Sequence, residues 1–246
     1  MRMATIAGLI RRRILVNFRA DPEVIQRVLP APFRPKLHAG HAIVGICLIR
    51  LEQIRPKWLP PFCGIASENA AHRIAVRWED GSGADREGVY IPRRDTDSWL
   101  NHFAGGRFFP GEHGLADFNV QDDGKRVSLA IKARDGRMNV VLRGRETAAL
   151  PATSCFASLE EASAYFAAGG VGYSATRDCC RLDGLRLETE GWSVRPLDVE
   201  QVTSSYFQST EFPAGSVTFD HALIMRDLQH EWHTEPNLAV QPASPR

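Results

Sequence analysis

Hydrophobic and polar positions alternate with a period of two over much of this chain, which is typical of β-strands. Glycine-containing turns separate several of these segments, at Gly81 and Gly83 and at the Asp-Gly pairs 123–124 and 135–136, and such turns predict hairpins between antiparallel neighbours. The pattern predicts a mainly β protein with an antiparallel meander near its middle. The expected strands are residues 12–19, 41–51, 63–78, 88–92, 115–121, 125–134, 137–147, 171–175, 182–190, 192–203 and 216–225.

Three short helices are expected between these strands. Asp21 followed by Pro22 is a typical N-cap and first helical position. Residues 95–98 form a cluster of capping side chains ahead of an apolar helical face, and Ser158 with Glu161 fits a capping box. The fold class we predict is therefore mainly β (α+β), with about three short peripheral helices.

One expected strand, residues 63–78, carries more polar groups than an interior strand usually does. Glu68, Asn69, His72 and Arg73 lie there among small and apolar residues. A charged group that is buried must be paired or hydrogen-bonded, or it changes its protonation state. The stretch is therefore a candidate wall of a pocket.

Composition and charge exclude some partners. The 246 residues are 43% hydrophobic and 24% charged, close to an average soluble globular protein, and the formal net charge is +1. Charge alone therefore favours neither a nucleic acid nor a membrane surface, and we expect a small-molecule ligand. No repeat or linker divides the chain, so we expect one domain over residues 1–236 and a disordered, Pro-rich tail over residues 237–246.

The five cysteines predict no disulfide framework or zinc site, because they are odd in number and lack CxxC spacing. Adjacent Cys179 and Cys180 could be a redox pair, but neighbouring cysteines rarely reach disulfide geometry without strain. The first apolar run is too short for a signal peptide, and no run could span a bilayer. We expect a cytoplasmic protein without a cofactor, and leave open a homo-oligomer.

Six segments stand out by their order and spacing along the chain: residues 17–23, 28–33, 67–69, 88–90, 106–110 and 219–222. Together they resemble the acetoacetate decarboxylase-like superfamily, in particular its uncharacterised YqjF-related branch (DUF2071). The resemblance implies a closed, cone-like antiparallel β-barrel with helices outside it and a ligand cavity within. It also implies a site made of an arginine, glutamates and a lysine that forms a Schiff base with a β-keto acid.

Only part of that site has a counterpart here. By the resemblance, the arginine falls on the run at 11–13, most closely on Arg11, and the glutamate of the interior strand falls on Glu68. A second family glutamate falls near Gly45, where this chain has none.

The lysine is the main departure from the family, because Pro110 is followed here by Gly111. Amine catalysis needs a desolvated lysine with a lowered pKa. The four lysines of the chain occupy a charged hairpin or proline-flanked loops, where we expect solvated side chains, so we predict that acetoacetate decarboxylase activity is absent. They are Lys36, Lys57, Lys125 and Lys132.

Glu68 is the first candidate catalytic residue, as an acid or base whose pKa is raised in an apolar cavity. The alternative is a structural partner for Arg73 or Arg11. Either arginine could clamp a substrate carboxylate in a bidentate manner, with Asn69 beside it, although Arg11 also fits an ordinary surface residue at the end of a strand.

A second polar cluster contains Arg93, Arg94, Asp95 and Arg107, and the loop from Pro110 to His113, with Glu112, lies close to it in sequence. If the barrel closes as the resemblance implies, this loop lines the cavity where the lysine would have been. His113 is then the best replacement acid or base, because its unperturbed pKa lies near neutrality. The alternative is a histidine on a surface loop.

The C-terminal histidines raise the question of a metal. His230, His233 and His221 lie near Glu231, but their spacing is not that of a helical zinc site, so we predict no metal. Asp220 and His221 are expected to form a buried hydrogen-bonded pair that fixes the last strand.

Taken together, these residues favour a small-molecule-binding barrel that acts on an organic (keto) acid without Schiff-base chemistry. The alternative, from a different functional class, is a non-catalytic ligand-binding or accessory protein. A purely structural domain would have no cavity.

Overall fold

The computed structural model describes residues 5–106, 109–177 and 180–240. Arg107, a predicted substrate-binding residue, and Cys179 lie outside these ranges. The described helices are α1 (Pro22–Val28), α2 (Trp99–Ala104) and α3 (Leu159–Ala167), with short 3-10 turns η1 (Pro61–Cys63) and η2 (Tyr206–Gln208). The strands are β1 (Ile6–Ala20), β2 (Arg34–Pro35), β3 (Leu37–His38), β4 (His41–Pro56), β5 (Ile65–Glu79), β6 (Asp85–Thr96), β7 (Gly114–Asp122), β8 (Arg126–Ala133), β9 (Asn139–Glu146), β10 (Val171–Ala175), β11 (Arg181–Thr189), β12 (Arg195–Ser204) and β13 (Val217–Ala239).

The three helices begin at the capping residues that the sequence predicts. The side chain of Asp21 accepts a hydrogen bond from the backbone N–H at the start of α1. Ser98 does the same for α2 and Ser158 for α3. Each cap satisfies a backbone donor that has no partner inside the helix. Asp95, from the predicted capping cluster, instead lies buried in β6, where Arg93 donates to it.

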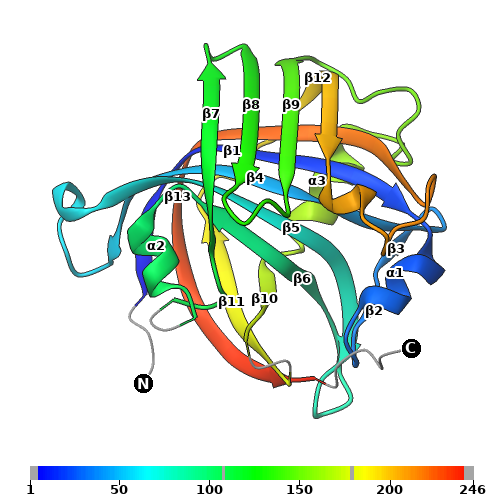
Figure 1. Ribbon diagram of the computed structural model, residues 1–246, viewed down its shortest axis with the longest axis horizontal. Helices are drawn as coiled ribbons and strands as arrows, with labels where there is room; N and C mark the ends of the chain where they lie inside the picture. Colours follow the sequence, from blue (N-terminus) through cyan, green and yellow to red (C-terminus); the bar gives the residue numbers. More distant parts are fainter. Residues whose placement is uncertain (1–4, 107–108, 178–179, 241–246) are drawn as a thin grey trace.

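The described strands form one 13-stranded sheet that closes on itself in two ways. Pairing of β5 with β6 and of β11 with β13 completes a ring of β13, β1, β4, β5, β6, β10 and β11, which we call the cavity ring. A second ring, the core ring, shares β13, β1, β4, β5 and β6 but continues through β7, β8, β9 and β12. In Figure 1, β7, β8 and β9 rise on one side of the shared strands and β10 and β11 lie on the other.

The mainly β class is confirmed, but the sheet is mixed. β6 pairs in parallel with both β7 and β10, whereas the other strand pairs are antiparallel. The chain passes through α2 between β6 and β7, and such a crossover permits parallel pairing where a tight turn does not. The expectation of a wholly antiparallel barrel is corrected at this strand.

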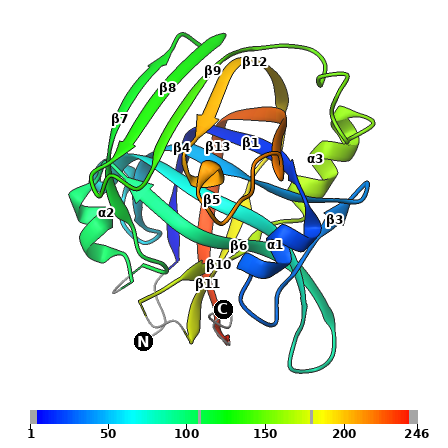
Figure 2. The same ribbon diagram turned by 45° about the vertical axis from the view of Figure 1, so that its right-hand side comes forward.

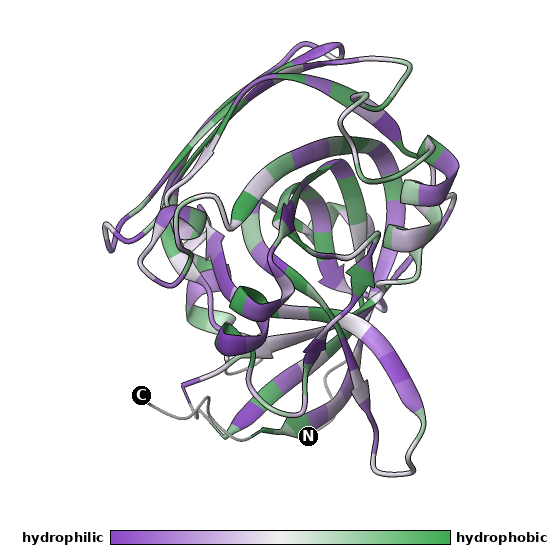
Figure 3. Cartoon of the chain, turned by 90° about the vertical axis from the view of Figure 1, so that its right-hand side faces the viewer, coloured by the Kyte–Doolittle hydropathy of each residue, from purple (hydrophilic) through white to green (hydrophobic). Residues whose placement is uncertain are grey.

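The shared strands bury side chains on both faces. β1 places Ile14, Val16 and Phe18 in the hydrophobic cluster of the core ring, while Leu15 packs with Phe166 of α3 in a second cluster. Figure 2 shows α3 on the side of the barrel away from β7 and β8. Burial on both faces explains why residues 41–51 of β4 are apolar without alternation. The hydropathy colouring of Figure 3 shows hydrophobic and hydrophilic bands following one another along many of the strands.

β13 is the longest strand and continues beyond Pro236 to Ala239. There it pairs with β11, through Leu182 with Leu238 and Arg181 with Ala239. The strand therefore reaches three residues into the predicted tail, because β11 offers a partner that the composition does not reveal. Residues 241–246 lie outside the described part of the chain.

Candidate functional site

A cavity of about 490 Å³ lies inside the cavity ring. Every strand of that ring contributes to its lining, together with α2 and the segment after α3. Most of the wall is apolar, and among the described residues the lining contains no aspartate or glutamate. It does contain arginines, so the cavity combines an apolar wall with positive charge.

Arg13 and Arg94 enter the cavity from different strands. The Nε of Arg13, on β1, donates to the Sγ of Cys47 at 3.4 Å. The Nε of Arg94, on β6, donates to the Oγ of Ser174 at 2.9 Å. Among the described residues neither guanidinium has a salt bridge. Burial lowers the pKa of Arg94 to about 10, which leaves it protonated at neutral pH.

Arg73, on β5, is the most deeply embedded of the three. Its Nη2 donates to the Oδ1 of Asn17, and its guanidinium carbon lies 4.9 Å from the ring centroid of Phe166. Burial lowers its pKa to about 10; the Cys47 thiol opposes that shift and nearby Arg13 adds to it. Three guanidiniums thus share one apolar space without a carboxylate among the described residues, an arrangement that is costly unless an anion enters.

A chain of hydrogen bonds holds Arg73 from behind. His221 Nδ1 lies 2.6 Å from Asp220 Oδ2, and its Nε2 lies 3.0 Å from Asn17 Nδ2. The buried Asp220–His221 pair expected from the sequence is confirmed. Burial alone would raise the pKa of Asp220, but hydrogen bonds from His221, Ser154 and the Cys155 backbone outweigh it and hold the pKa well below its usual range. The Asp220 carboxylate therefore orients the His221 imidazole, and the imidazole orients the Asn17 amide that accepts a hydrogen bond from Arg73.

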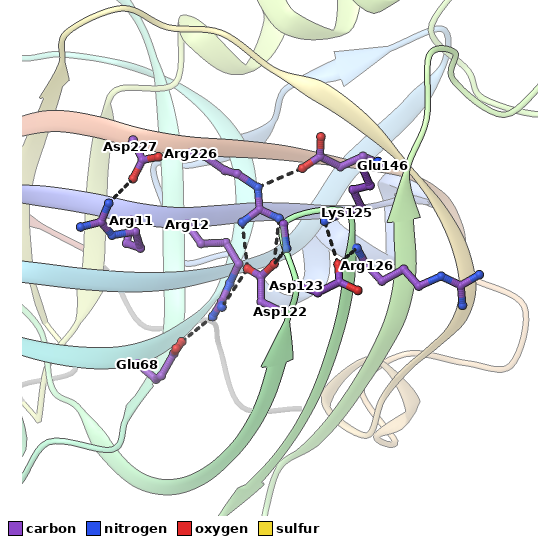
Figure 4. A network of polar contacts seen from close by, with 11 residues as sticks. Arg11, Arg12, Glu68, Asp122, Asp123, Lys125, Arg126, Glu146, Arg226 and Asp227 are labelled. Carbon is purple, nitrogen blue, oxygen red and sulfur yellow. Dashed lines mark hydrogen bonds and ion pairs between the residues drawn. The ribbon is translucent and has the colours of Figure 1, made fainter.

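Glu68 lies on the opposite face of β5 from this site. Side chains alternate along a strand, so Asn69 and Arg73 line the cavity while Glu68 faces the core ring. Its carboxylate accepts from Arg12 at 2.7 Å, in the network that Figure 4 shows. Burial raises its pKa, and Arg12 opposes that rise. The expectation of Glu68 as a cavity acid is corrected, and its described salt-bridge partner is Arg12 rather than Arg73 or Arg11.

Arg11 lies at the surface. Its side chain is 50% exposed and forms a salt bridge with Glu52 at 2.9 Å. A second salt bridge joins it to Asp227 at 2.6 Å (Figure 4). The pairing of β1 with β4 shifts register between Ile10 and Arg12, so Arg11 is an extra residue in a β-bulge. Of the run at 11–13, on which the resemblance places the family's arginine, the residue that lines the cavity is Arg13 and not Arg11.

The other predicted site residues divide between the cavity and its surroundings. His113 lines the cavity, and burial, reinforced by Arg94, lowers its pKa to about 3. Asn69 also lines it, donating to Ser67 Oγ at 2.9 Å. Glu112 is not among the described lining residues, and it pairs with Arg177 at 2.7 Å on the outside.

The position of the expected lysine cannot hold a side chain without rearrangement. Gly111 has φ +80, and a Cβ built on it would lie 2.6 Å from the Cβ of Ser174 and 3.2 Å from the Nε of Arg94. Ser174 and Arg94 therefore together occupy the space that a side chain at position 111 would enter. None of the four lysines, all within the described ranges, lines the cavity.

The described residues were compared with the requirements of a metal site and of a membrane-spanning helix. In the described part of the chain, no group of three or more His, Cys, Asp or Glu side chains is arranged to hold a metal ion. His233 instead lies 3.4 Å from Glu188 and 3.5 Å from Glu231. Across the same residues no helix has the length and hydropathy required to cross a bilayer.

Comparisons with known proteins agree with this architecture. No curated protein matches the sequence. Among solved structures, acetoacetate decarboxylase from Legionella pneumophila matches with a TM-score of 0.62 and 11% identity, covering 97% of this chain and 88% of that one. The enduracididine biosynthesis enzyme MppR, complexed with pyruvate, matches with a TM-score of 0.55 and 12% identity, covering 98% and 91%.

An acetoacetate decarboxylase-like enzyme from Sphingomonas wittichii RW1 matches with a TM-score of 0.53 and 12% identity, covering 98% of this chain and 94% of that one. At such low identities these likenesses establish the acetoacetate decarboxylase-like fold alone. The sequence itself adds the family, because residues 10–229, from within β1 to within β13, match one family profile. The chain belongs to the DUF2071 family, which is described as an uncharacterized conserved protein.

Proposed function

We propose that the cavity binds an organic acid and that Arg13, Arg73 and Arg94 hold its carboxylate. The observation that carries the proposal is the meeting of three guanidiniums, that of Arg73 buried and those of Arg13 and Arg94 partly buried, in an apolar cavity whose described lining has no acidic side chain. A carboxylate supplies the missing negative charge and accepts charge-assisted hydrogen bonds in the fork geometry that arginine offers. MppR, which shares the fold, was crystallised with the carboxylate pyruvate, and this supports the ligand class.

Calorimetric titration tests the proposal with hexanoate, acetoacetate and the neutral analogue hexanol. We expect both acids to bind and hexanol to bind much more weakly. Arg73→Met and Arg94→Met should each weaken acid binding by about tenfold or more, since a hydrogen bond to a charged group contributes about 1.5–3 kcal/mol. Arg11→Met is the matched control at the surface and should leave affinity unchanged. Equal binding of hexanol and hexanoate would refute the proposal.

Chemistry on the bound acid is a second candidate function, and His113 is the residue that favours it. Its imidazole lines the cavity, and the low pKa leaves it neutral and able to accept a proton. A bound carboxylate would raise that pKa by adding negative charge. His113 could then take a proton from the carbon beside the keto group of a keto acid, and the guanidiniums would stabilise the enolate that forms.

Deuterium exchange at that carbon, followed by NMR in D₂O, separates catalysis from binding. Catalysis predicts exchange in the wild type, and in His113→Gln a loss of exchange with acid affinity retained. If a panel of keto acids binds without exchange or decarboxylation, the protein is a non-catalytic binding protein.

Amine catalysis is expected to be absent. Lys36 is the lysine nearest the site, in a small side pocket that shares Arg13 and Arg73 with the main cavity, where it pairs with Glu87 at 2.6 Å. Incubation with acetoacetate and borohydride should leave every lysine unmodified by mass spectrometry. A trapped adduct on Lys36 would contradict this.

A further inference from the structure

The cavity is much larger than a small keto acid needs. Its volume of about 490 Å³ corresponds to about sixteen water-sized units, at roughly 30 Å³ each. Pyruvate has only six non-hydrogen atoms, and a carboxylate held by the arginines accounts for three of them. Most of the space would stay empty around such a ligand, although apolar cavities of this size usually hold drug-sized molecules.

The charge is concentrated toward one end of the strands that enclose this space. Cys47, which receives the Arg13 hydrogen bond, pairs across β4 and β5 with Ala71, and Ala71 pairs across β5 and β6 with Arg94. Arg73 is two residues beyond Ala71 on β5. Cys47 is also close enough to influence the pKa values of Arg73 and Arg94. The three guanidiniums therefore surround one level of the sheet.

The opposite end of the same strands is mainly apolar. Beyond Cys47, β4 lines the cavity with Ile49, Leu51 and Ile54, and Ile54 is seven residues after Cys47, so at ~3.3 Å per residue this wall extends for about 23 Å. Arg55 follows in the lining, and its guanidinium donates to the backbone carbonyls of Leu59 and Gln53, both at 2.9 Å. On β1, which pairs antiparallel with β4, the described lining residues are Arg13 and Ile6. Both strands therefore lead from the three guanidiniums to an end whose one charged side chain in the described lining is bonded to the backbone.

The remaining walls keep this character. Leu185 and Leu187 of β11 and Trp232 of β13 close the cavity on the far side. Besides Arg55 and His113, the amides of Asn69 and Asn101 are polar exceptions, but Asn101 donates to Asn69 at 3.4 Å and both donate to Ser67 Oγ at 2.9 Å. These amides therefore satisfy one another and leave the apolar length without a strong demand for polar ligand groups.

The cavity opens beside α2. Leu100 of α2 lines it while 56% exposed, and exposed Cys63 of η1 lines it from the β4–β5 connection. Phe62, next to Cys63, is 86% exposed. The opening is thus bordered by apolar side chains, and the three guanidiniums lie deeper along the strands.

We infer that the natural ligand is an amphipathic monocarboxylic acid whose apolar tail, of about eight to twelve carbons by volume, lies along β1 and β4 toward the opening beside α2. The inference rests on the proposed function, since the arginines hold the head group. It adds that tail burial, and not only the carboxylate, determines which acid binds.

A homologous series of straight-chain acids from butyrate to dodecanoate tests the inference by calorimetric titration below the micelle concentration. Each added methylene should tighten binding by about fourfold, since burial of one CH₂ contributes about 0.8 kcal/mol. The gain should stop once the tail reaches the opening. Affinity independent of chain length, with Arg73→Met still abolishing binding, would overturn the inference and leave the proposed function standing. Failure of every acid, or equal binding of the matching alcohols, would overturn the proposed function.

A narrowed wall provides a second test. Leu187→Trp should weaken decanoate by tenfold or more relative to hexanoate, because only the longer tail needs that space. Leu37→Trp, at an exposed position outside the lining, is the matched control. Ile65→Phe serves as a second wall variant if circular dichroism shows that Leu187→Trp does not fold. Equal effects on both acids would contradict the inferred tail position.

Discussion

Arg12 and Arg13 are neighbours on β1, yet they face different interiors. Arg12 points into the core ring, where Glu68 accepts from it at 2.7 Å and Asp122 lies 3.4 Å away. Asp122 in turn pairs with Arg226 at 2.8 Å (Figure 4). Arg13 points into the cavity, where its described polar contact is a thiol. One face of the strand supplies counter-charges from the protein, and on the other face, in our proposal, a ligand supplies them.

This difference shows how the same residue type can serve structure and binding on one strand. A buried ion pair contributes little net stability, but removal of one partner leaves an uncompensated charge and is costly. An arginine with no acidic partner has no such pair to break, and its own burial already opposes folding. Substitutions on the two faces should therefore differ in sign as well as in size.

The largest effect is expected for Arg12→Met. It leaves the buried Glu68 carboxylate without its partner and should lower the free energy of unfolding by about 3–5 kcal/mol. Arg13→Met, one residue along with the same change of side chain, should leave stability unchanged or raise it. Urea unfolding at neutral pH measures both. If both variants lost the same free energy of unfolding, the two faces of β1 would not differ in how they hold an arginine.

Ligand-dependent stability is the next largest effect. At about one hundred times its dissociation constant, a bound organic acid should stabilise the wild type by about 2.7 kcal/mol. Arg73→Met should lose this gain without losing its own stability, whereas Glu68→Gln should keep the gain on a less stable protein. Thermal melts of the three proteins, with and without decanoate, measure these gains and the stability of each variant. An unchanged gain in Arg73→Met would show that the cavity cation does not hold the acid.

The smallest effect concerns pH and His72, which faces the core ring beside Ser204. Burial lowers its pKa to about 3, with Arg93 adding to the shift. The unfolded chain takes up a proton near pH 6.5, while the folded protein stays neutral until about pH 3, so stability falls as pH decreases through that window. Between pH 6.5 and 4.5 this residue should account for about 2 kcal/mol.

His72→Asn should flatten that dependence, and urea unfolding at the two pH values measures the change. Other buried histidines contribute to the wild-type slope, including His230, whose pKa burial lowers to about 4. The difference between wild type and variant isolates His72. An identical slope in both would mean that the His72 imidazole is already charged in the folded state.

The sequence predicts where helices and strands lie better than it predicts which face of a strand lines the cavity. The meander, the three capped helices and the Asp220–His221 pair follow from local rules of turns, caps and polar burial. In strands that are buried on both sides, hydropathy does not alternate in a way that distinguishes the two faces. The sequence around Glu68 therefore cannot tell whether its side chain faces the cavity or the core ring. The bulge at Arg11 depends on how β1 pairs with β4, which β1 alone does not reveal.

The site residues also depend on contacts between segments that are distant in the sequence. Arg94 is identified as a cavity residue only from the fold, in which β6, β10 and the Gly111 turn meet around Ser174. The absence of the lysine could be seen in the sequence, but the residue that takes up its space could not. The positive φ of Gly111 and its closeness to the Arg94 guanidinium can be recognised only in the folded structure.

The closing role of β13 has a consequence for biosynthesis. Ile6 of β1 pairs with Trp232 of β13, and the same strand also completes both rings through β11 and β12. Because β13 follows β1 by about two hundred residues in the chain, neither ring can close until β13 has been synthesised. Until then β1 has a free edge that can pair with other chains, and its long-range contacts make folding slow. A nascent chain stopped before Val217 would keep its arginines in water and its sheet open to aggregation.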